Sequence, residues 1–368
     1  MRVIFAGGGT GGHVYPALSV AASLRRSEPE ADLLYLGTRG GTEERLVREH
    51  GIPFRVVRSG QIRGKSPWQI ASSAARIAAG VLEAQAAFRS FAPDVVFATG
   101  GYASIPVVLG AALKRVSVTV FLPDVYPGWA VRIATLLATH VATTSDGALD
   151  YLPHSKTAVT GYPLRPEFWQ TTRAEGRQRL GLDGGPCLLV SGASSGSRTL
   201  NDAILNALDA LLEVCEVVHL TGRADETRVR SARARLPEPL RTRYHVHGYL
   251  DDIAWAMAAA DLAVLRAGAS SLAEPPAFGL PAILVPGAFS DQHRNAAHMA
   301  SMGAAILLEE ACLDELPALV RSLLGSNDRL AAMSSASSRL ARPAAADEIA
   351  ALLLNSRRAA NVSEVCSL

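Results

Sequence analysis

A histidine follows five closely spaced glycines near the start of the chain, in the stretch AGGGTGGHVYPA between Ala6 and Ala17. A glycine-rich turn that leads from a strand into a helix can direct backbone N–H groups and the helix N-terminus at a phosphate. Histidine is the residue type best suited to general-base work at neutral pH, so His13 at that place can take a proton from a substrate hydroxyl. It could equally hydrogen-bond the backbone and shape the loop, or bind a phosphate of the substrate.

The same glycines also fit the dinucleotide-binding pattern G-x-G-x-x-G, through Gly7, Gly9 and Gly12. Two features argue against that alternative. An acidic residue should follow the second strand and bind a ribose, but the sequence there reads LGTRGG, without Asp or Glu. The helix after the loop also begins with His13 and Pro16, which a site for a pyrophosphate alone does not require. A nicotinamide-dependent oxidoreductase is therefore the alternative that the sequence favours least.

Another glycine-rich loop, GASSGSR at 192–198, follows the apolar run CLLVS at 187–191 in the second half of the chain. Its backbone amides at a helix N-terminus, with the hydroxyls of Ser194 and Ser195, can stabilise a diphosphate. A nucleotide-bound divalent metal is usually held by a carboxylate pair in a D-x-D motif, and the chain contains none. We therefore expect a diphosphate site that needs no bound metal or cofactor.

Short apolar runs alternate with helical stretches along both halves of the chain, which is typical of parallel sheets covered on both faces. The expected strands are 3–6, 33–36, 54–57, 95–98, 118–122 and 140–144 in the first half, and 187–191, 217–221, 244–247, 262–265 and 282–285 in the second. Each half opens with a strand, a glycine- or serine-rich turn and a helix. We therefore predict an α/β protein made of two doubly wound, Rossmann-like domains that face each other across a cleft.

The segment GYPLRPEFW at 161–169 has two prolines in quick succession, which is typical of a linker without helix. A chain of 368 residues also exceeds the usual size of one domain. We place the first domain at 1–163 and the second at 164–343. The residues from about 344 to 368 are expected to form a helix that packs back on the first domain.

The composition narrows the choice of partner and compartment. The net charge is +2, but residues 1–163 carry 16 Lys and Arg against 11 Asp and Glu, while residues 164–368 carry 20 against 23. This asymmetry argues against nucleic-acid binding and for an anionic partner of the first half. The four cysteines lack metal-ligand spacing, and the chain begins directly with an apolar strand, so we expect a reduced, cytoplasmic protein.

Seven stretches, in order along the chain, resemble motifs of the MurG family of glycosyltransferases. They are GGGTGGHVYPAL (7–18), ATGGYASIPVVLGA (98–111), TGYPLR (160–165), SGASSGSRTLN (191–201), HLTG (219–222), GYLDDIAWAMAAADLAVLRAGASSLAE (248–274) and DQHRNA (291–296). The resemblance implies the GT-B class of fold. It also implies an inverting transferase that moves N-acetylglucosamine from UDP-N-acetylglucosamine to the 4-hydroxyl of undecaprenyl-pyrophosphoryl-N-acetylmuramoyl-pentapeptide, in peptidoglycan synthesis.

The resemblance assigns the polyprenyl-pyrophosphate-linked acceptor to the first domain and the UDP-sugar donor to the second. The acceptor-binding residues it implies are Thr10, Gly11, Gly12, His13, Gly100, Gly101, Tyr102 and Ser104. The donor-binding residues it implies are Arg165, Ser194, Ser195, Gly196, Leu250, Ala269, Ser270, Glu274, Gln292 and Asn295. Within this set, Glu274 would bind the ribose hydroxyls, the Leu250 backbone the uracil, and the two amides of the 292–295 turn the hydroxyls of the donor sugar.

The acceptor side departs from the family pattern. The family carries His-Glu-Gln-Asn after its fifth strand, whereas residues 122–125 of this chain read Leu-Pro-Asp-Val. Asp124 is therefore a second candidate for a catalytic acid or base. The departure leaves open a transferase that moves a UDP-sugar to a different lipid or small-molecule acceptor. A donor-binding protein without transferase activity is a further alternative.

Residues 55–91 combine apolar and basic side chains. The stripe of apolar residues at helical spacing consists of Ile70, Ala74, Ile77, Val81, Ala84, Phe88 and Phe91. Such a stripe is more often a core face than a membrane face. However, residues 55–89 also hold six Lys and Arg against the single acid Glu83, and Trp68 lies at the edge. We therefore expect the protein to associate peripherally with the anionic inner face of the cell membrane.

Overall fold

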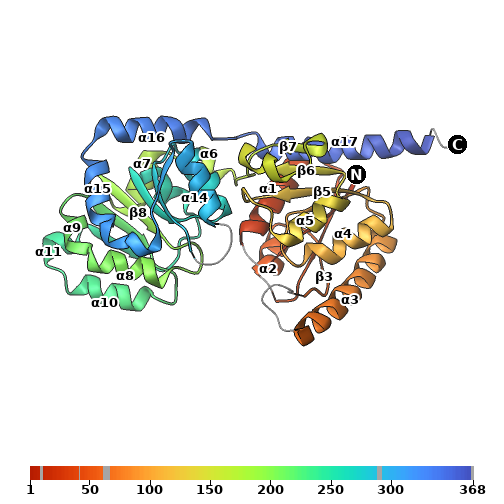
Figure 1. Cartoon of the computed structure of the whole chain (residues 1–368), viewed down its shortest axis with the longest axis horizontal. Coiled ribbons are helices and arrows are strands. Elements are labelled where there is room, and N and C mark those ends of the chain that lie inside the picture. The colour runs from red at the N-terminus through yellow and green to blue at the C-terminus, as the bar shows by residue number, and fades with distance from the viewer. Residues whose placement is uncertain (9–10, 41, 61–66, 288–291, 366–368) are drawn as a thin grey trace. The chain divides into compact units, whose positions relative to one another are not determined.

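The computed structural model of the chain describes residues 1–8, 11–40, 42–60, 67–287 and 292–365. These residues form two compact units, each with its own parallel β-sheet (Figure 1). Unit 1 comprises Met1–Arg165 together with Arg342–Leu368, and unit 2 comprises Pro166–Ala341. The expected α/β class with two doubly wound sheets is therefore confirmed.

Among its described residues, unit 1 forms a sheet of seven parallel strands in the order β3-β2-β1-β4-β5-β6-β7. The strands are β1 (Arg2–Ala6), β2 (Asp32–Gly37), β3 (Phe54–Val56), β4 (Val95–Ala98), β5 (Ser117–Leu122), β6 (His140–Thr143) and β7 (Thr157–Val159). The helices are α1 (Gly11–Ser27), α2 (Thr42–Glu49), α3 (Pro67–Phe91), α4 (Ser104–Leu113), α5 (Trp129–Leu137) and α17 (Ala345–Val365), with 3₁₀ segments η1 (Asp146–Tyr151) and η2 (His154–Lys156). β1 pairs with both β2 and β4, so the strand order reverses between β1 and β4.

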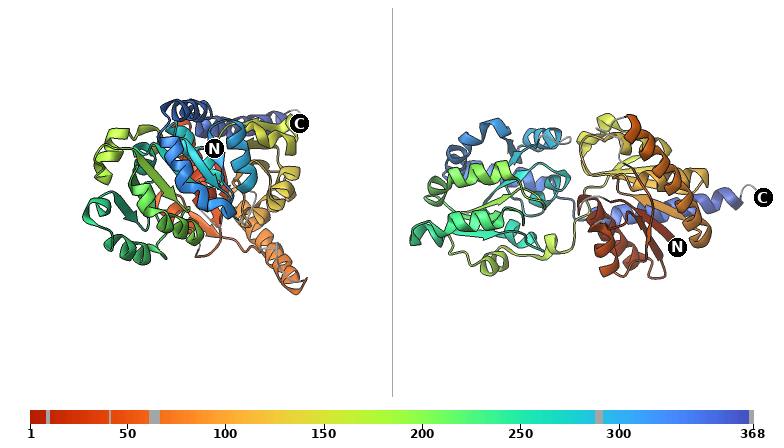
Figure 2. Two further views of the ribbon diagram at one scale, coloured as in Figure 1. Left: turned by 60° about the vertical axis from the view of Figure 1, so that its left-hand side comes forward. Right: turned by 90° about the horizontal axis from the view of Figure 1, so that it is seen from below.

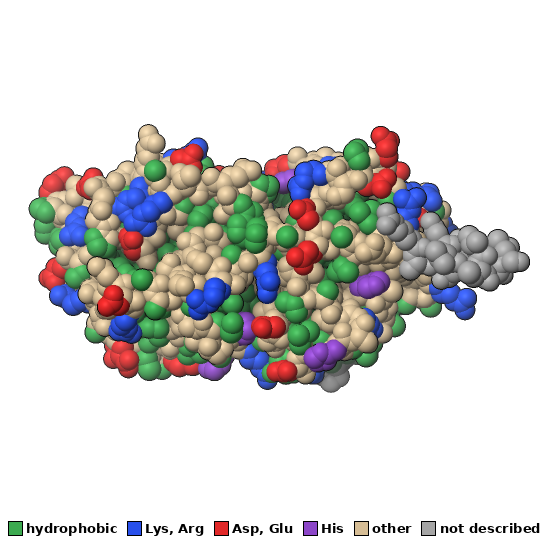
Figure 3. Space-filling view, turned by 90° about the horizontal axis from the view of Figure 1, so that it is seen from above, with side chains coloured by type: hydrophobic (Ala, Val, Ile, Leu, Met, Phe, Trp, Pro, Cys, Tyr) green, Lys and Arg blue, Asp and Glu red, His purple; other side chains and the backbone are tan. Residues whose placement is uncertain are grey.

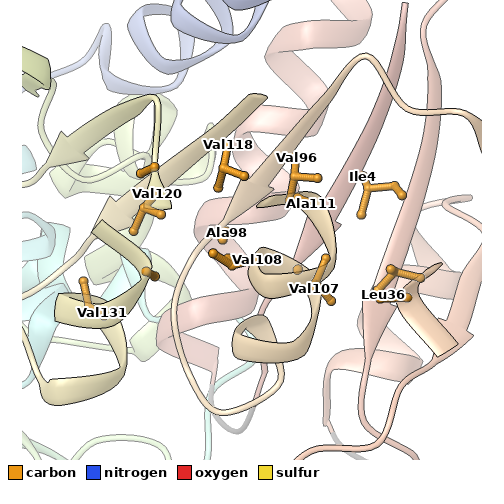
Figure 4. Close-up of a cluster of buried hydrophobic side chains, with 14 of the residues drawn as sticks. Ile4, Leu36, Val96, Ala98, Val107, Val108, Ala111, Val118, Val120 and Val131 are labelled. Atoms are coloured by element: carbon orange, nitrogen blue, oxygen red, sulfur yellow. The ribbon is translucent and has the colours of Figure 1, made fainter. Parts of the chain in front are cut away.

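The unit 1 strands are apolar throughout because both faces of the sheet are covered. On one face, Ile4, Val96 and Val118 from three strands pack with Val107 and Ala111 of α4 (Figure 4). Helices α3 and α5 extend this layer, since α4 contacts both of them. Helices α1, α2 and α17 cover the opposite face.

Helix α17 belongs to unit 1 although it follows unit 2 in the sequence. It packs against α1, and its residues Ile349 and Leu353 are fully buried. Asp347 accepts hydrogen bonds from the Ser23 hydroxyl and, at 2.6 Å, from the Arg26 guanidinium of α1. The last helix therefore completes the core of the unit that begins the chain.

The described part of unit 2 forms six parallel strands in the order β10-β9-β8-β11-β12-β13. The strands are β8 (Cys187–Ser191), β9 (Glu216–Leu220), β10 (Tyr244–His247), β11 (Leu262–Arg266), β12 (Ala282–Val285) and β13 (Ala305–Leu307). The helices are α6 (Glu167–Gln170), α7 (Arg173–Leu180), α8 (Arg198–Asn206), α9 (Leu208–Leu212), α10 (Glu226–Ala234), α11 (Glu238–Arg241), α12 (Ala254–Ala259), α13 (Glu274–Ala277), α14 (Gln292–Ser301), α15 (Leu316–Leu324) and α16 (Asn327–Arg339), with 3₁₀ segments η3 (Ala269–Leu272) and η4 (Glu310–Glu315). Here the strand order reverses between β8 and β11.

Helices also cover both faces of the unit 2 sheet (Figure 2). On one face, Val190 and Val264 pack with Leu200 of α8, Leu211 of α9 and Val320 of α15. On the other face, α12 packs against α7 and β8, and α14 against β12 and β13. In each unit, the carboxyl ends of the parallel strands therefore lie along one edge of a sheet that helices cover on both faces.

All eleven strands expected from the sequence are confirmed, with ends that differ by at most one residue. The sequence does not predict β7 and β13, because each has three residues at a sheet edge and is largely half-buried, without a long apolar run. The prediction of a linker without helix over 161–169 is wrong at its end. Residues Glu167–Gln170 form one helical turn after Pro166, a position where the missing proline N–H costs little.

The predicted apolar stripe on α3 has two different surroundings. Ala84 and Phe88 are buried in the core of unit 1, whereas Ile70 is 38% exposed and Trp68 86% exposed. On the surface of each unit, Lys and Arg side chains are interspersed with Asp and Glu (Figure 3). Within the ranges that the structure describes, no helix is long and apolar enough to cross a membrane.

Candidate active site

The loops after β1 and β4 meet where the strand order of unit 1 reverses. Gly101 has a φ of 74°, and a Cβ added there would lie 2.3 Å from the carbonyl oxygen of Gly8. A Cβ on Gly7 would lie 2.1 Å from Thr99 Oγ1. The two loops can approach this closely because these positions are glycines. The first turn of α1 is thereby brought beside the end of β4.

His13 connects that turn of α1 to the end of β4. Its Nδ1 lies 2.7 Å from the carbonyl oxygen of Thr99, whose hydroxyl donates a 2.7 Å hydrogen bond to the His13 carbonyl oxygen. A carbonyl oxygen can only accept, so Nδ1 carries the proton, and in the neutral ring Nε2 carries the lone pair. A Cβ on Gly100 would lie 3.3 Å from His13 Cε1, so the glycine makes room for the ring. This orientation is the one that a general base requires.

Two buried polar side chains, Tyr35 and Glu43, contact the start of the first glycine loop. The Tyr35 hydroxyl donates a 3.1 Å hydrogen bond to the Gly7 carbonyl oxygen. Burial, with the nearby charge of Glu43, raises the pKa of Tyr35 far above its usual range, so the phenol remains a donor. Glu43 is fully buried and accepts a 2.6 Å hydrogen bond from the Thr38 hydroxyl. A Cβ on Gly8 would lie 2.5 Å from Glu43 Oε1, so this carboxylate is in close contact with the loop.

The other acceptor candidates from the first loop lie at the start of α1. Gly11 and Gly12 are its first two residues, and the Gly12 carbonyl oxygen accepts a 2.9 Å hydrogen bond from the Tyr162 hydroxyl. Thr10 lies outside the described residues. The expected acceptor roles of these three residues stay predictions.

The glycine loop after β4 contributes Tyr102, and Ser104 follows it as the first residue of α4. The Tyr102 ring centroid lies 6.4 Å from that of Trp129, the first residue of α5, and both side chains are half-buried. Ser104 is buried and donates a 2.8 Å hydrogen bond from its hydroxyl to the Gly101 carbonyl oxygen. The Ser104 hydroxyl therefore shapes the loop, while the aromatic pair is partly accessible.

Asp124 and Arg165 occupy different places in unit 1. Asp124 lies in the loop after β5, half-buried, while Leu122 before it is 1% exposed. The Arg165 guanidinium lies 4.7 Å from the centroid of the Tyr15 ring of α1, a cation–π contact. Arg165, expected among the donor-binding residues, therefore belongs to unit 1 and packs on α1.

The third glycine loop, residues 192–197, follows β8 in unit 2. A Cβ on Gly192 would lie 2.3 Å from the Ser197 nitrogen, and a Cβ on Gly196 would lie 2.2 Å from the Thr221 carbonyl oxygen. Ser194 and Ser195 are exposed on the turn between them. The glycines fold the loop tightly at the N-terminus of α8, where backbone N–H groups favour an anion.

A buried hydrogen-bond network fixes α8 behind this loop. His219 is fully buried, with Nε2 2.9 Å from Asn201 Oδ1 and Nδ1 2.7 Å from the Tyr244 hydroxyl. Asn201 donates from Nδ2 to the Thr221 carbonyl oxygen at 2.9 Å and to Asp225 at 2.8 Å. Burial lowers the pKa of His219 to about 3, so this imidazole is neutral. The network holds α8 against the end of β9.

The remaining donor candidates lie on loops at the same edge of the sheet. Leu250 follows β10, Ala269 and Ser270 begin η3, and Glu274 is the first residue of α13; all four are half-buried.

The two amides of α14 are placed differently from each other. Gln292 Oε1 accepts a 2.8 Å hydrogen bond from the Gly287 N–H, whereas Asn295 is fully buried and donates to the Ala267 carbonyl oxygen at 3.1 Å. In this structure Asn295 therefore holds the loop after β11, and its role toward a sugar stays a prediction.

The glycine-rich loops of the two units and the histidine in unit 1 can be compared with features of known proteins. The model of the glycosyltransferase family 28 N-terminal domain matches residues 3–143, and that of the family 28 C-terminal domain matches residues 187–349. The chain belongs to glycosyltransferase family 28. It is therefore a glycosyltransferase with the GT-B type of fold.

Two full-length relatives of this family 28 enzyme carry the same name. Proteins from Desulforudis audaxviator and Moorella thermoacetica are each 38% identical over 365 residues, which cover 95% and 96% of this chain and 96% and 98% of theirs. Both are called UDP-N-acetylglucosamine--N-acetylmuramyl-(pentapeptide) pyrophosphoryl-undecaprenol N-acetylglucosamine transferase. The crystal structure of Acinetobacter baumannii MurG has a TM-score of 0.78 and 26% identity, and covers 96% of this chain and 99% of that one.

Three features of this family 28 enzyme escape the sequence analysis. Trp129 stands beside Tyr102, Arg266 donates to the Ser197 hydroxyl at 2.6 Å, and His219 is bonded on both ring nitrogens. For the first, the order Pro127-Gly128-Trp129 is a local signal, because an aromatic residue follows a turn there. The other two depend on partners far apart in sequence, which no local pattern reveals.

Proposed function

We propose that this enzyme transfers N-acetylglucosamine from UDP-N-acetylglucosamine to the 4-hydroxyl of undecaprenyl-pyrophosphoryl-N-acetylmuramoyl-pentapeptide, with inversion at the anomeric carbon. The names of relatives that are 38% identical over nearly the whole chain support this reaction. The observation that carries the chemistry is the His13 imidazole, whose Nδ1 is bound to the Thr99 carbonyl oxygen and whose Nε2 is the basic nitrogen.

In the proposed step, His13 Nε2 takes the proton of the 4-hydroxyl while that oxygen forms a bond to the anomeric carbon of the donor. The bond from this carbon to the β-phosphate oxygen breaks, and UDP leaves with the electron pair. The Thr99 carbonyl oxygen keeps the ring oriented and stabilises the imidazolium that forms. Asp124, after β5, is the second candidate for this base.

For the donor, we propose that the diphosphate binds the N–H groups of the third glycine loop at the N-terminus of α8. Glu274 then accepts hydrogen bonds from the ribose hydroxyls, and the Leu250 backbone pairs with the uracil edge. The other proposed donor contacts are Arg165, Ser194, Ser195, Gly196, Ala269, Ser270, Gln292 and Asn295.

We propose further that transfer needs no divalent metal, because N–H groups and hydroxyls of this loop meet the charge of the leaving diphosphate. Treating the purified enzyme with EDTA should leave the transfer rate unchanged. A rate that falls with EDTA and returns with Mg²⁺ would contradict this.

The loop after β5 favours a second candidate function, the transfer of a UDP-sugar to a different lipid or small-molecule acceptor. Its segment Leu-Pro-Asp-Val buries Leu122 and leaves Asp124 as its one charged side chain. A different set of polar groups there would select a different acceptor.

We also propose that the enzyme works in the cytoplasm, bound peripherally to the inner face of the membrane. Exposed apolar side chains on α3, α4 and α5 support this: Trp68 is 86% exposed, Leu82 72%, Leu113 72% and Leu136 79%. Arg76 and Arg89 of α3 are exposed as well. The enzyme should sediment with vesicles containing anionic phosphatidylglycerol and not with neutral phosphatidylcholine vesicles, and Trp68→Ala should weaken this association. Equal sedimentation with both would contradict it.

The decisive experiment incubates the purified enzyme with the lipid-linked muramoyl-pentapeptide and labelled UDP-N-acetylglucosamine. We expect label in the lipid product and release of one UDP per sugar transferred. Tight donor binding without transfer to this acceptor would reject the first function and favour the second. Absence of both donor binding and transfer would reject both.

A further inference from the structure

Arg266, the last residue of β11, spans the point where the strand order of unit 2 reverses. Its side chain is 11% exposed. Its Nε and Nη2 donate to Ser197 Oγ at 3.1 and 2.6 Å. Its Nη1 donates to the carbonyl oxygens of Val285 and Pro286 at 3.4 and 3.2 Å. Arg266 thereby connects the ends of β11 and β12 to the residue that caps α8.

The charge of Arg266 is matched inside the protein. Nη2 also donates to Glu310 Oε1 of η4 at 2.5 Å. Hydrogen bonding and charge from Arg266 lower the pKa of Glu310, so this carboxylate is ionised at neutral pH. A guanidinium has five N–H groups, and five hydrogen bonds to protein atoms involve it here. The side chain is therefore built into the protein rather than turned toward a substrate.

Ser197, which Arg266 binds, joins the third glycine loop to α8. Ser197 Oγ also accepts a hydrogen bond from the Leu200 N–H at 3.4 Å, which caps α8. Its nitrogen lies so close to Gly192 that a Cβ there would be 2.3 Å away. A displacement of Ser197 would therefore shift both the loop and the first turn of the helix.

We propose that Arg266, paired with Glu310, is a positioning residue for the diphosphate of the donor. By fixing Ser197, it orients the N–H groups of residues 192–197 before the donor binds, and this preorganisation lowers the cost of binding. The inference rests on the proposed donor site. Its ligand is the diphosphate of a nucleotide and not the nucleoside.

The test compares the affinities of uridine and UDP for the full-length enzyme by isothermal titration calorimetry. In Arg266→Gln, we expect UDP to bind about tenfold to hundredfold more weakly, the effect of losing charge-assisted hydrogen bonds. Uridine binding should stay within about threefold of wild type. Arg266→Lys should not restore UDP binding, because a single ammonium cannot replace the planar fork. KM for the UDP-sugar should rise more than kcat falls.

Glu310→Gln separates positioning from direct contact. If Arg266 contacted the phosphates, removing the Glu310 charge would release the guanidinium and strengthen UDP binding. Positioning predicts weaker UDP binding, because Arg266 loses one of its anchors. Ser197→Ala should behave like Glu310→Gln, and Ser197→Thr, which keeps the hydroxyl, should retain wild-type affinity.

The exposed pair Arg321 and Glu213, 3.0 Å apart in the same unit, provides the matched control. Arg321→Gln should bind uridine and UDP as wild type does. UDP binding by Arg266→Gln equal to wild type would overturn the positioning role, as would equal weakening for uridine and UDP. A wild-type enzyme that binds neither UDP nor its sugar conjugate would overturn the proposed donor site and, with it, this inference.

Discussion

Each unit has a notable polar side chain near the point where its strand order reverses, His13 in unit 1 and Arg266 in unit 2, and the two are bound in different ways. In unit 1, His13 bonds the Thr99 carbonyl oxygen through one ring nitrogen and keeps the lone pair of the other. In unit 2, Arg266 makes five hydrogen bonds to protein atoms and pairs with Glu310. Near the reversal of the strand order, unit 1 thus holds the proposed base and unit 2 the proposed positioning residue.

Two histidines, the half-buried His13 and the buried His219, illustrate the same difference. Among the residues that the structure describes, His13 is bonded on one nitrogen, whereas His219 is bonded on both, to Asn201 and Tyr244, and burial lowers the pKa of His219 to about 3. Residue type alone therefore does not identify a catalytic base. A catalytic base requires, at the least, a nitrogen whose lone pair is available to the substrate.

His13→Gln gives the largest expected effect and tests the unit 1 half of the comparison. Loss of a general base should lower kcat by about 10²–10⁴-fold. UDP affinity should not change, because the proposed diphosphate loop lies in unit 2. Steady-state kinetics and calorimetry measure the two quantities.

His50 offers the control, because its Nδ1 also bonds a carbonyl oxygen, that of Leu46, at 2.8 Å. His50→Gln should keep wild-type kcat. If His13→Gln also kept it, the base would have to be sought elsewhere, first at Asp124.

Gly101→Ala should destabilise unit 1 by about 3 kcal/mol. The left-handed backbone costs an alanine about 1–2 kcal/mol, and the contact with the Gly8 carbonyl oxygen adds overpacking of similar size. Gly40→Ala is the control, since Gly40 has a similar φ of 71° but open space around it. It should cost only about 1–2 kcal/mol. Urea unfolding of both variants would show the difference, and equal losses would remove the contact between the loops as a cause.

His219 should make the stability of unit 2 depend on pH. Its pKa of about 3 in the folded state lies below the ordinary value of 6.5, so folding favours the neutral ring. The stabilisation is complete above pH 6.5 and decreases as the pH falls from 6.5 toward 3, by up to about 1.4 kcal/mol per pH unit. Urea unfolding between pH 6.5 and 5 should show a smaller pH dependence for His219→Gln than for wild type. Identical slopes would contradict the role of His219.

Ala193→Gly should have the smallest effect, a stabilisation of unit 2 by no more than about 1 kcal/mol. Ala193 has a φ of 66°, which is unfavourable for alanine, although glycine has more conformational freedom to lose on folding. Differential scanning calorimetry should show a rise of about 2 °C in the transition of unit 2. Ala92→Gly, at a φ of 46° in unit 1, should shift only the other transition. A lower transition temperature for Ala193→Gly would mean that the conformational freedom that glycine loses on folding outweighs the relief of backbone strain.

The sequence predicts the parts of the fold and site that depend on local patterns. Apolar runs identify eleven strands, and the glycine-rich turns identify both loops where the strand orders reverse. The resemblance to the MurG family is confirmed by the relatives and by the family match. These features are local because strand burial and glycine backbone geometry are set by a few adjacent residues.

The rest depends on contacts between distant residues. His13 and Thr99 are 86 positions apart, and Arg266 and Glu310 are 44 apart. The spacing of Gln292 and Asn295 predicts a shared helix face, but it does not reveal that Asn295 is buried against Ala267. Tertiary packing decides which polar groups bond to other groups of the protein, and no local sequence pattern reveals this choice.

Helix α17 also has a consequence for synthesis on the ribosome. Unit 2 is an uninterrupted segment of the nascent chain, whereas the core of unit 1 needs Ile349 and Leu353 from near its end. Domains fold as they emerge, so the unit with the proposed diphosphate loop can fold before the unit that carries His13 is complete. Translation that stops before residue 345 would therefore release a chain with an intact unit 2 and an unfinished unit 1. The proposed base therefore lies in the unit that completes its folding last.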